Sequence, residues 1–282
     1  MPFLVRLRVF AKYRLPAFLV RFLRGFWRTI VRPAARWGRR VKAWLIQTWW
    51  LAKNALRRGG PLPPDDLIFL VSGGRDIVWF LKSGERARKS IEGVLANNGI
   101  RTSRLRGILD FGCGAGRVLR HFRGLRNAGL YGVDYNPDLI AWCRTALPFA
   151  LFEVNSFLGP LPFPADAFDL VYALSVFTHL TEDQQAVWLK EIGRVLRPGG
   201  SLLVSVHGAY HVRDYPRETR DLFERGEMIV FAGEAAGTNL CAAFHPPAYM
   251  KSRFAPGFEF VDGIPEGALG NPRQDLYLFR KP

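Results

Sequence analysis

The chain has 282 residues, a formal net charge of +16 and three cysteines. Its length suits one domain with a substantial core and a considerable appendage, because domains typically run to roughly 100 to 200 residues. The odd number of cysteines, without a C-x-x-C pair, argues against a disulfide framework and against a zinc site, and it is typical of a cytoplasmic protein.

Residues 1–60 carry almost all of the excess charge, with 15 lysines and arginines, no acid and five of the eight tryptophans. Within residues 17–32, arginines recur on one helical face and phenylalanines on another, which predicts short amphipathic helices. The longest uncharged run, residues 43–52, is far shorter than the roughly 20 apolar residues that a membrane span requires. Arginines also interrupt every apolar run, which argues against a signal peptide.

Three interpretations of residues 1–60 stay open. Tryptophan and phenylalanine beside arginine favour a helical extension that lies on an anionic membrane surface, peripherally, at the inner face of the membrane. The same extension could instead pack on the rest of the chain. It could also bind the phosphates and bases of a nucleic acid, a partner that we rank below the membrane.

The Pro-Leu-Pro-Pro stretch at residues 61–64 is a stiff linker and marks the expected domain boundary. Residues 61–104 are expected to contain this linker followed by helices over 65–71 and 85–98. Gly99 stands where a C-terminal helix cap is expected.

The chain is organised around residues 108–117, an apolar run that ends in Asp110 and passes into glycines at every second position. This pattern predicts a strand, a tight turn and a helix. Because glycine has no Cβ, a ligand can lie against the turn and next to the N-terminus of the helix. The acid at the strand end would repel a pyrophosphate, and it suits a ligand with an ammonium group.

Residues 105–207 resemble the class I S-adenosylmethionine-dependent methyltransferases. Four residues match the family's first motif position by position, namely Asp110, Gly112, Gly114 and Gly116. Asp134 ends a second strand and matches the family's ribose-binding carboxylate, to which vicinal hydroxyls donate. The resemblance implies S-adenosyl-L-methionine as cofactor and an α/β fold, with a doubly wound, seven-stranded, mostly parallel Rossmann-like sheet.

Later segments extend the resemblance. The family commonly has an aspartate at the third strand end that accepts from adenine; here Asn155 stands there, beside Ser156, and its carbonyl can still accept one hydrogen bond. A fourth strand over 168–176 includes Ser175, and the turn after it matches the family's motif beside the methionine end of the cofactor. In the family, helices before the first strand often close over the cofactor, which here implicates residues 72–80.

The rest of the expected domain, residues 105–282, has clear helix and strand patterns. Thr181 is expected to cap a helix over 182–196. A Pro-Gly-Gly turn leads into a fifth strand over 201–206. Segments 258–261 and 275–279 are expected to form the family's antiparallel hairpin beside strand five.

Residues 207–257 do not fit the common core and are expected to build the acceptor site. They contain the polar residues His207, Tyr210, His211, Asn239, His245 and Tyr249. Methyl transfer gains most from aligning nucleophile, methyl and sulfur, and a general base contributes further when the acceptor is a hydroxyl. His179 is the first candidate for that base and His207 is the second.

The sequence therefore predicts a methyltransferase that acts on an oxygen of a small molecule, a sugar or a lipid-linked glycan at the membrane surface, without a metal. One alternative is an RNA methyltransferase that uses the basic extension to bind phosphates. Another is a non-catalytic S-adenosylmethionine-binding scaffold. The acceptor and the oligomeric state stay open, because one fold hosts many acceptors.

Overall fold

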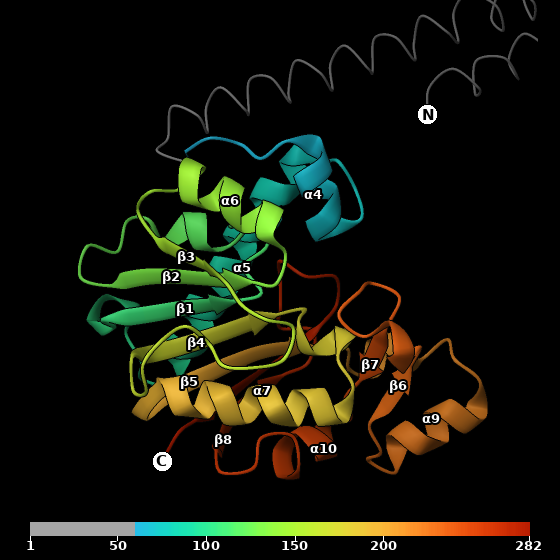
Figure 1. The fold of residues 1–282 in the computed structure, drawn as a ribbon. Helices are drawn as coiled ribbons and strands as arrows, with labels where there is room; N and C mark the ends of the chain where they lie inside the picture. The colour runs from blue at the N-terminus through green and yellow to red at the C-terminus, as the bar shows by residue number, and fades with distance from the viewer. Residues whose placement is uncertain (1–59) are drawn as a thin grey trace, which may run out of the picture. The chain divides into compact units, whose positions relative to one another are not determined.

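A seven-stranded sheet forms the centre of the structure, a computed structural model that describes residues 60–282 (Figure 1). The helices expected within residues 1–59 lie outside the described residues. The strand order is β3-β2-β1-β4-β5-β9-β8. Five strands run parallel to one another: β1 (Gly107–Phe111), β2 (Gly129–Asp134), β3 (Leu151–Val154), β4 (Phe168–Leu174) and β5 (Leu196–Val206).

The last two strands are antiparallel. β9 (Asp275–Arg280) pairs with β5, and β8 (Glu259–Ile264) pairs with β9 at the edge of the sheet. The expected hairpin beside strand five is thereby confirmed, and so is the doubly wound, mostly parallel fold. Because β5 begins at Leu196, the Pro-Gly-Gly turn lies within this strand and forms a bulge against β4.

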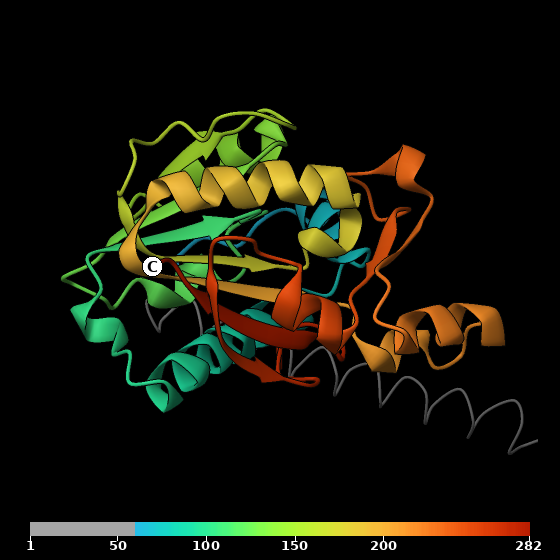
Figure 2. The same ribbon diagram turned by 90° about the horizontal axis from the view of Figure 1, so that it is seen from below.

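Helices cover both faces of the sheet (Figure 2). On one face, Leu109 and Phe111 pack with Trp188 of α7 (Glu182–Val195). On the other face, Ile108 packs with Ile91 of α5 (Ile77–Asn97), in a cluster that also includes α6 (Pro137–Ala146). Successive side chains of a strand point to opposite faces. The apolar run of β1, buried throughout, therefore serves two cores at once.

Helix boundaries follow capping side chains. α7 begins after Thr181, which forms a capping box with Gln184, as expected for a Thr-x-x-Gln sequence. α5 begins much earlier than the expected residue 85, because the Asp76 carboxylate accepts from the N–H groups of Val78 and Trp79. α4 (Asp65–Ser72) matches its expectation. Gly99 follows the end of α5 with a positive φ of 75°, in accord with its predicted capping role.

The helix expected directly after the glycine turn is not present. Residues 117–124 form turns and a short 3-10 helix, η3 (Leu119–Phe122). Gly124 and the nearby start of β2 leave room for only about two helical turns. Burial of the Arg120 side chain, which donates to the Pro61 carbonyl, holds this segment against the domain.

The residues between β5 and β8 form small elements outside the main sheet. They are α8 (Ala209–Val212), α9 (Arg217–Glu224), a two-stranded sheet of β6 (Ile229–Phe231) and β7 (Ala242–Phe244), and α10 (Pro247–Ser252). Three further 3-10 turns are η2 (Thr102–Arg104), η4 (Phe177–His179) and η5 (Gly233–Ala235). Within residues 60–282, no helix is long and apolar enough to cross a membrane.

A close approach of two backbones joins α5 to the glycine turn. A Cβ on Gly84 would lie 2.0 Å from the carbonyl oxygen of Arg117, whereas a Cβ on Gly93, in the same helix, would have no atom within 4 Å. The two glycines therefore have different reasons to be there, and only Gly84 allows this contact.

We expect Gly84→Ala to lower the free energy of unfolding by about 1 to 3 kcal/mol, because the added methyl group overpacks a backbone contact. Gly93→Ala is the matched control and should raise it by about 0.5 to 1 kcal/mol, since alanine favours the helix. Urea denaturation of both variants measures these changes. Equal effects of the two substitutions would contradict the close packing at Gly84.

Candidate cofactor-binding site

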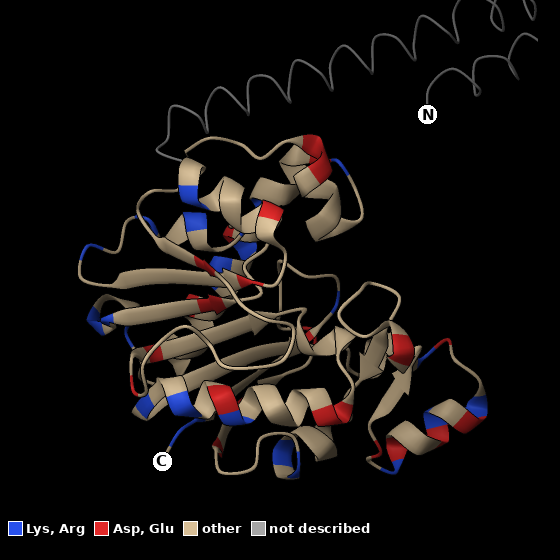
Figure 3. Ribbon diagram, viewed as in Figure 1, with Lys and Arg blue, Asp and Glu red and all other residues tan. Residues whose placement is uncertain are grey.

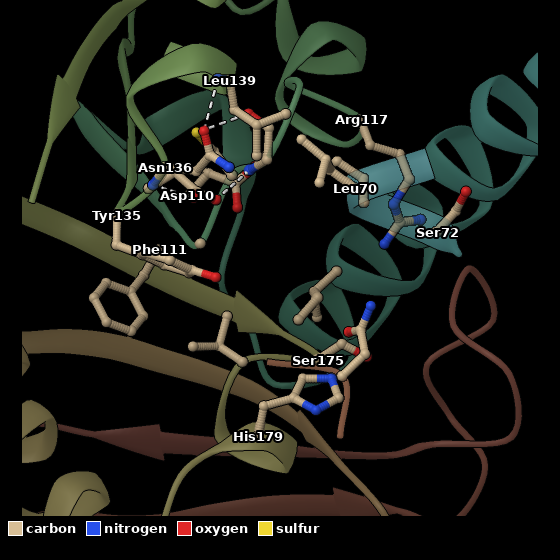
Figure 4. A pocket seen from close by; sticks show the side chains of 18 of the residues that line it. Leu70, Ser72, Asp110, Phe111, Arg117, Tyr135, Asn136, Leu139, Ser175 and His179 are labelled. Atoms are coloured by element: carbon tan, nitrogen blue, oxygen red, sulfur yellow. Dashed lines mark hydrogen bonds between the residues drawn. The ribbon is translucent and has the colours of Figure 1, made fainter. Parts of the chain in front are cut away.

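A cavity of about 770 Å³ lies at the carboxyl ends of β1, β2 and β4. The chain runs from β1 outward to β2 and β3, and then crosses to β4 on the other side of β1. The loops after β1 and β4 therefore diverge, and ligands of doubly wound sheets bind in the crevice between such loops. Figure 4 shows side chains pointing into this cavity from α4, from the carboxyl ends of β1 and β2, and from the turn after β4.

Asp110 lies at the bottom of the cavity and is almost completely buried. Its Oδ2 has no hydrogen-bond partner among the described residues. Burial raises the pKa of Asp110 to about 7, although the neighbouring Tyr172 hydroxyl and, less strongly, the Arg117 guanidinium lower it. A buried carboxylate oxygen without a partner is costly unless a ligand supplies a donor, and so this position suits an ammonium group.

The turn after β1 exposes its backbone to the cavity. Gly112 and Gly114 have φ values of 76° and 54°, a region that L-residues rarely adopt. Both residues line the cavity. Gly116 does not, because it packs against Leu147, whose Cδ1 would lie 2.4 Å from a Cβ on this glycine. Gly116 therefore has a packing role in this structure, and its expected part in cofactor binding stays a prediction.

Asp134 ends β2 and lines the cavity next to this turn. Its Oδ2 accepts from the Gly114 N–H at 2.9 Å, and its Oδ1 accepts from the Asn136 N–H at 3.0 Å. Burial raises the pKa of Asp134, while these N–H groups lower it. Each carboxylate oxygen keeps a further lone pair. Asp134 can therefore accept from two adjacent hydroxyls.

The end of β3 contributes Asn155, which is buried and lines the cavity. Its Nδ2 donates to the Ser156 carbonyl at 2.8 Å, which leaves Oδ1 as the atom that can accept from a ligand. The Ser156 side chain is exposed and does not line the cavity, so nothing in this geometry supports the expectation for this residue. Phe157 does line it, packed edge to face against Tyr135 with ring centroids 6.1 Å apart.

A buried polar network forms the opposite wall. Ser175 follows β4 with a φ of 60° and donates its N–H to Ser205 Oγ at 2.9 Å. Its own Oγ accepts from Asn271 Nδ2 at 3.0 Å, and Asn271 Oδ1 accepts from Arg117 at 2.9 Å. Burial lowers the pKa of Arg117 to about 10, although Asp110 raises it. This network connects three separate parts of the chain at the cavity.

Sequence reasoning missed Arg117 and Asn271. Arg117 directly follows the glycine turn, a position that could have identified it. Asn271 lies in the loop between β8 and β9, and nothing in its local sequence signals a cavity. The neighbouring Gly270 and Pro272 also line the cavity. Residues 72–80 are expected to close over the cofactor, and two of them, Ser72 and Trp79, line the cavity. Phe80 of the same segment is buried in the core.

His179 lines the cavity at the end of η4. Its Nδ1 lies 2.9 Å from the Cys241 carbonyl oxygen. Because a carbonyl oxygen only accepts, Nδ1 carries the hydrogen, and Nε2 of the neutral ring keeps a lone pair. The Cys241 carbonyl therefore selects the tautomer in which Nε2 can accept a proton.

His207, the second candidate base, does not line the cavity. Its ring centroid lies 6.3 Å from that of His179 and 4.3 Å from that of His211. Burial lowers the pKa of His207 to about 3, and the two neighbouring histidines lower it as well. His207 is therefore a weak base that stays neutral.

Of the six polar residues named above for 207–257, only Asn239 lines the cavity, where Thr238 lies beside it. His245 is fully buried and its Nε2 bonds to Gln185 Oε1 at 3.0 Å. The Tyr249 hydroxyl donates to Glu182 at 2.9 Å. Tyr210 contacts Arg213 instead of the cavity. His245 and Tyr249 connect the small elements to the rest of the domain, because buried polar groups need partners. The acceptor-site role expected for residues 207–257 stays a prediction.

The chain is similar to known methyltransferases. Residues 109–204 match the protein family described as methyltransferase domain. The demethylmenaquinone methyltransferase of Chlorobaculum parvum is 31% identical over 136 residues, which are 48% of this chain and 52% of that protein. The fatty-acid O-methyltransferase of Mycolicibacterium smegmatis is 35% identical over 117 residues, which are 40% of this chain and 42% of that protein. The chain thus spans about half the length of these relatives.

Among solved structures, a chain of the complex between a Haloferax volcanii methyltransferase activator and a methyltransferase is similar to this one. The TM-score is 0.52 at 18% sequence identity, covering 78% of this chain and 99% of that chain. This likeness concerns the fold alone.

The raised pKa of Asp110 predicts a pH-dependent stability. The folded state keeps the proton up to a pH of about 7, whereas the unfolded state loses it near 4. The contribution of Asp110 to stability should therefore fall as the pH rises between these values, by up to about 4 kcal/mol. Asp110→Asn should gain stability relative to the wild type over this range, because the buried histidines contribute equally to both proteins. Urea denaturation of both proteins, without ligand, from pH 4 to pH 8 measures it, and parallel curves would contradict the assignment.

The residues present fit S-adenosyl-L-methionine. The orphaned Asp110 oxygen suits the ammonium group of that molecule, and Asp134 suits its ribose hydroxyls. A Cβ on Gly112 would lie 2.4 Å from a methyl carbon of Val176, and it would take up space in the cavity that both residues line. The motifs, the sheet order and the family match agree that residues 109–204 form a methyltransferase domain.

Proposed function

We propose that the protein transfers a methyl group from S-adenosyl-L-methionine to an oxygen of a small-molecule or lipid-like acceptor. One observation carries the proposal: a single cavity contains the unpaired carboxylate of Asp110, the ribose-type carboxylate of Asp134 and the free lone pair of His179. Two of these groups serve the cofactor, and the third serves an acceptor that must lose a proton.

Each residue has a distinct task in this proposal. Asp134 accepts from the ribose hydroxyls, Asp110 holds the ammonium group and Asn155 Oδ1 accepts from adenine. When bound, the cofactor supplies a methyl group on a positively charged sulfur. Aligning an acceptor with that methyl can contribute roughly 7 to 11 kcal/mol to the lowering of the barrier. The cavity walls around Ser175 and His179 provide the alignment.

His179 supports an oxygen as the acceptor atom. A hydroxyl is a weak nucleophile until a base removes its proton, and a positioned base contributes about 10² to 10⁴-fold. Nε2 of His179 has the lone pair for this task, because Nδ1 donates to Cys241.

The acceptor class is supported by the relatives and by the cavity walls. The two relatives are named for action on a menaquinone precursor and on fatty acids. In this chain, Leu70, Trp79 and Phe157 give the cavity apolar walls. Residues 1–60 would keep the protein at an anionic membrane, where lipid-like acceptors, including lipid-linked glycans, reside.

Calorimetric titration of S-adenosylhomocysteine tests the cofactor site. We expect micromolar binding to the full chain and an affinity at least about tenfold lower for Asp134→Asn, a loss of about 1.4 kcal/mol. Glu153→Gln is the control, because Glu153 lies on the neighbouring strand and pairs with Arg144 outside the cavity. Its affinity should be unchanged. If the folded wild type did not bind S-adenosylhomocysteine, the proposal would be wrong, and the protein would not be a methyltransferase.

The membrane part has its own test. The full chain should co-sediment with phosphatidylglycerol-containing vesicles and much less with phosphatidylcholine vesicles, because anionic lipids attract residues 1–60 at about 1 kcal/mol per basic residue near the surface. Raised salt should release it. Salt-sensitive binding to RNA without binding to anionic vesicles would support the RNA methyltransferase alternative instead.

A further inference from the structure

Exposed apolar side chains gather around the cavity. Of the twelve large hydrophobic residues that are most exposed within residues 60–282, ten line the cavity or directly neighbour in sequence a residue that does. Six of these form what we call the rim, between 37% and 76% exposed: Phe69, Leu70, Trp79, Phe157, Leu240 and Leu269. Soluble proteins rarely cluster apolar residues in this way unless something covers them.

The rim comes from both sides of the cavity. Phe69 and Leu70 lie on α4, whose Leu67 and Ile68 face the core. Leu240 lies in the loop before β7. Figure 1 shows α4 and this loop on opposite sides of the carboxyl ends of β1 and β4. A surface that covered both would therefore also cover the entrance to the cavity.

The charges around the rim do not by themselves select a partner. Arg75 lies 5.6 Å from the Phe69 ring centroid, but α4 begins with Asp65 and Asp66. Figure 3 shows residues of both signs around α4. Attraction to an anionic surface must come from elsewhere in the chain, and the 15 basic residues of 1–60 can supply it.

Chain length connects these two features. The basic segment joins the described domain at Gly60, and α4 begins at Asp65. Five extended residues span at most about 18 Å. The Pro61 carbonyl also accepts a hydrogen bond from Arg120, so this connection is short and is held against the domain. A segment bound to a membrane would therefore keep α4 and its apolar residues near the membrane surface.

We propose that the rim docks on an anionic lipid bilayer, so that the cavity opens toward the lipid phase and a lipid-like acceptor enters directly from it. This inference rests on the proposed function and deepens it. The basic segment supplies affinity, and the rim sets the orientation. Apolar side chains enter the boundary between headgroups and acyl chains in such a contact.

Site-specific labelling of the full chain tests the orientation. The three native cysteines are buried, so an introduced surface cysteine can be labelled selectively with bimane. Phe69→Cys and Leu240→Cys place the dye on two sides of the rim, outside the residues that line the cavity. Val187→Cys is the matched control: Val187 is 45% exposed, close to the 47% of Phe69, and it lies on the exposed side of α7, outside the rim, although the next residue, Trp188, is buried and lines the cavity.

The labelled proteins are mixed with phosphatidylcholine–phosphatidylglycerol vesicles that contain a doxyl-labelled lipid. We expect each rim dye to lose roughly half of its fluorescence and to shift to the blue, with no change at position 187. The two rim positions check each other should one substitution disturb folding. S-adenosylhomocysteine titration of each labelled protein reports folding and decides the proposed function separately from the docking result.

Four outcomes would overturn the docking proposal. The protein may sediment with vesicles while neither rim dye is quenched, or the control dye may be quenched equally. The rim dyes may already be shielded without vesicles, which would mean that another segment of this chain covers the rim. The protein may also bind RNA and ignore vesicles altogether.

Discussion

The structure depends on how the turn after β1 is held between its neighbouring strands. The N–H groups of Gly112 and Cys113 both donate to the Val133 carbonyl at 2.9 Å, and the Gly114 N–H donates to the Asp134 carboxylate. These bonds fix the turn to the end of β2. Because the turn is fixed, its backbone and both carboxylates face one cavity, and α5 can approach closely at Gly84.

This arrangement buries two ionisable groups at the site, which costs desolvation free energy. Asp110 is buried with an unpaired oxygen, and Arg117 is buried with neutral partners only. Each group partly offsets the burial of the other, as the opposing effects on their pKa values indicate. A site that already contains a buried carboxylate and a buried guanidinium is prepared for a zwitterionic ligand, and needs little reorganisation to bind one.

The elements around the cavity differ in how far their side chains are exposed to solvent. The sheet is buried on both faces and has little freedom, whereas α4 and the loops near Leu240 and Leu269 keep large apolar side chains in solvent. Function in this fold is built on such variable parts over a shared core. The apolar rim and the His179 lone pair are therefore the features that would distinguish this chain's acceptor.

Local sequence determined the strands of the main sheet, the starts of α4 and α7 and the motifs expected at the cofactor site. Apolar runs, the Thr181 cap and the alternate glycines act over a few residues, so they can be recognised without tertiary structure. Tertiary structure decided the rest. The 3-10 turn after Arg117, the burial of His245 and the contribution of Asn271 to the cavity all depend on contacts between distant segments, which no local pattern contains. Burial then gave Asp110 and His207 their altered pKa values, because desolvation depends on the assembled fold.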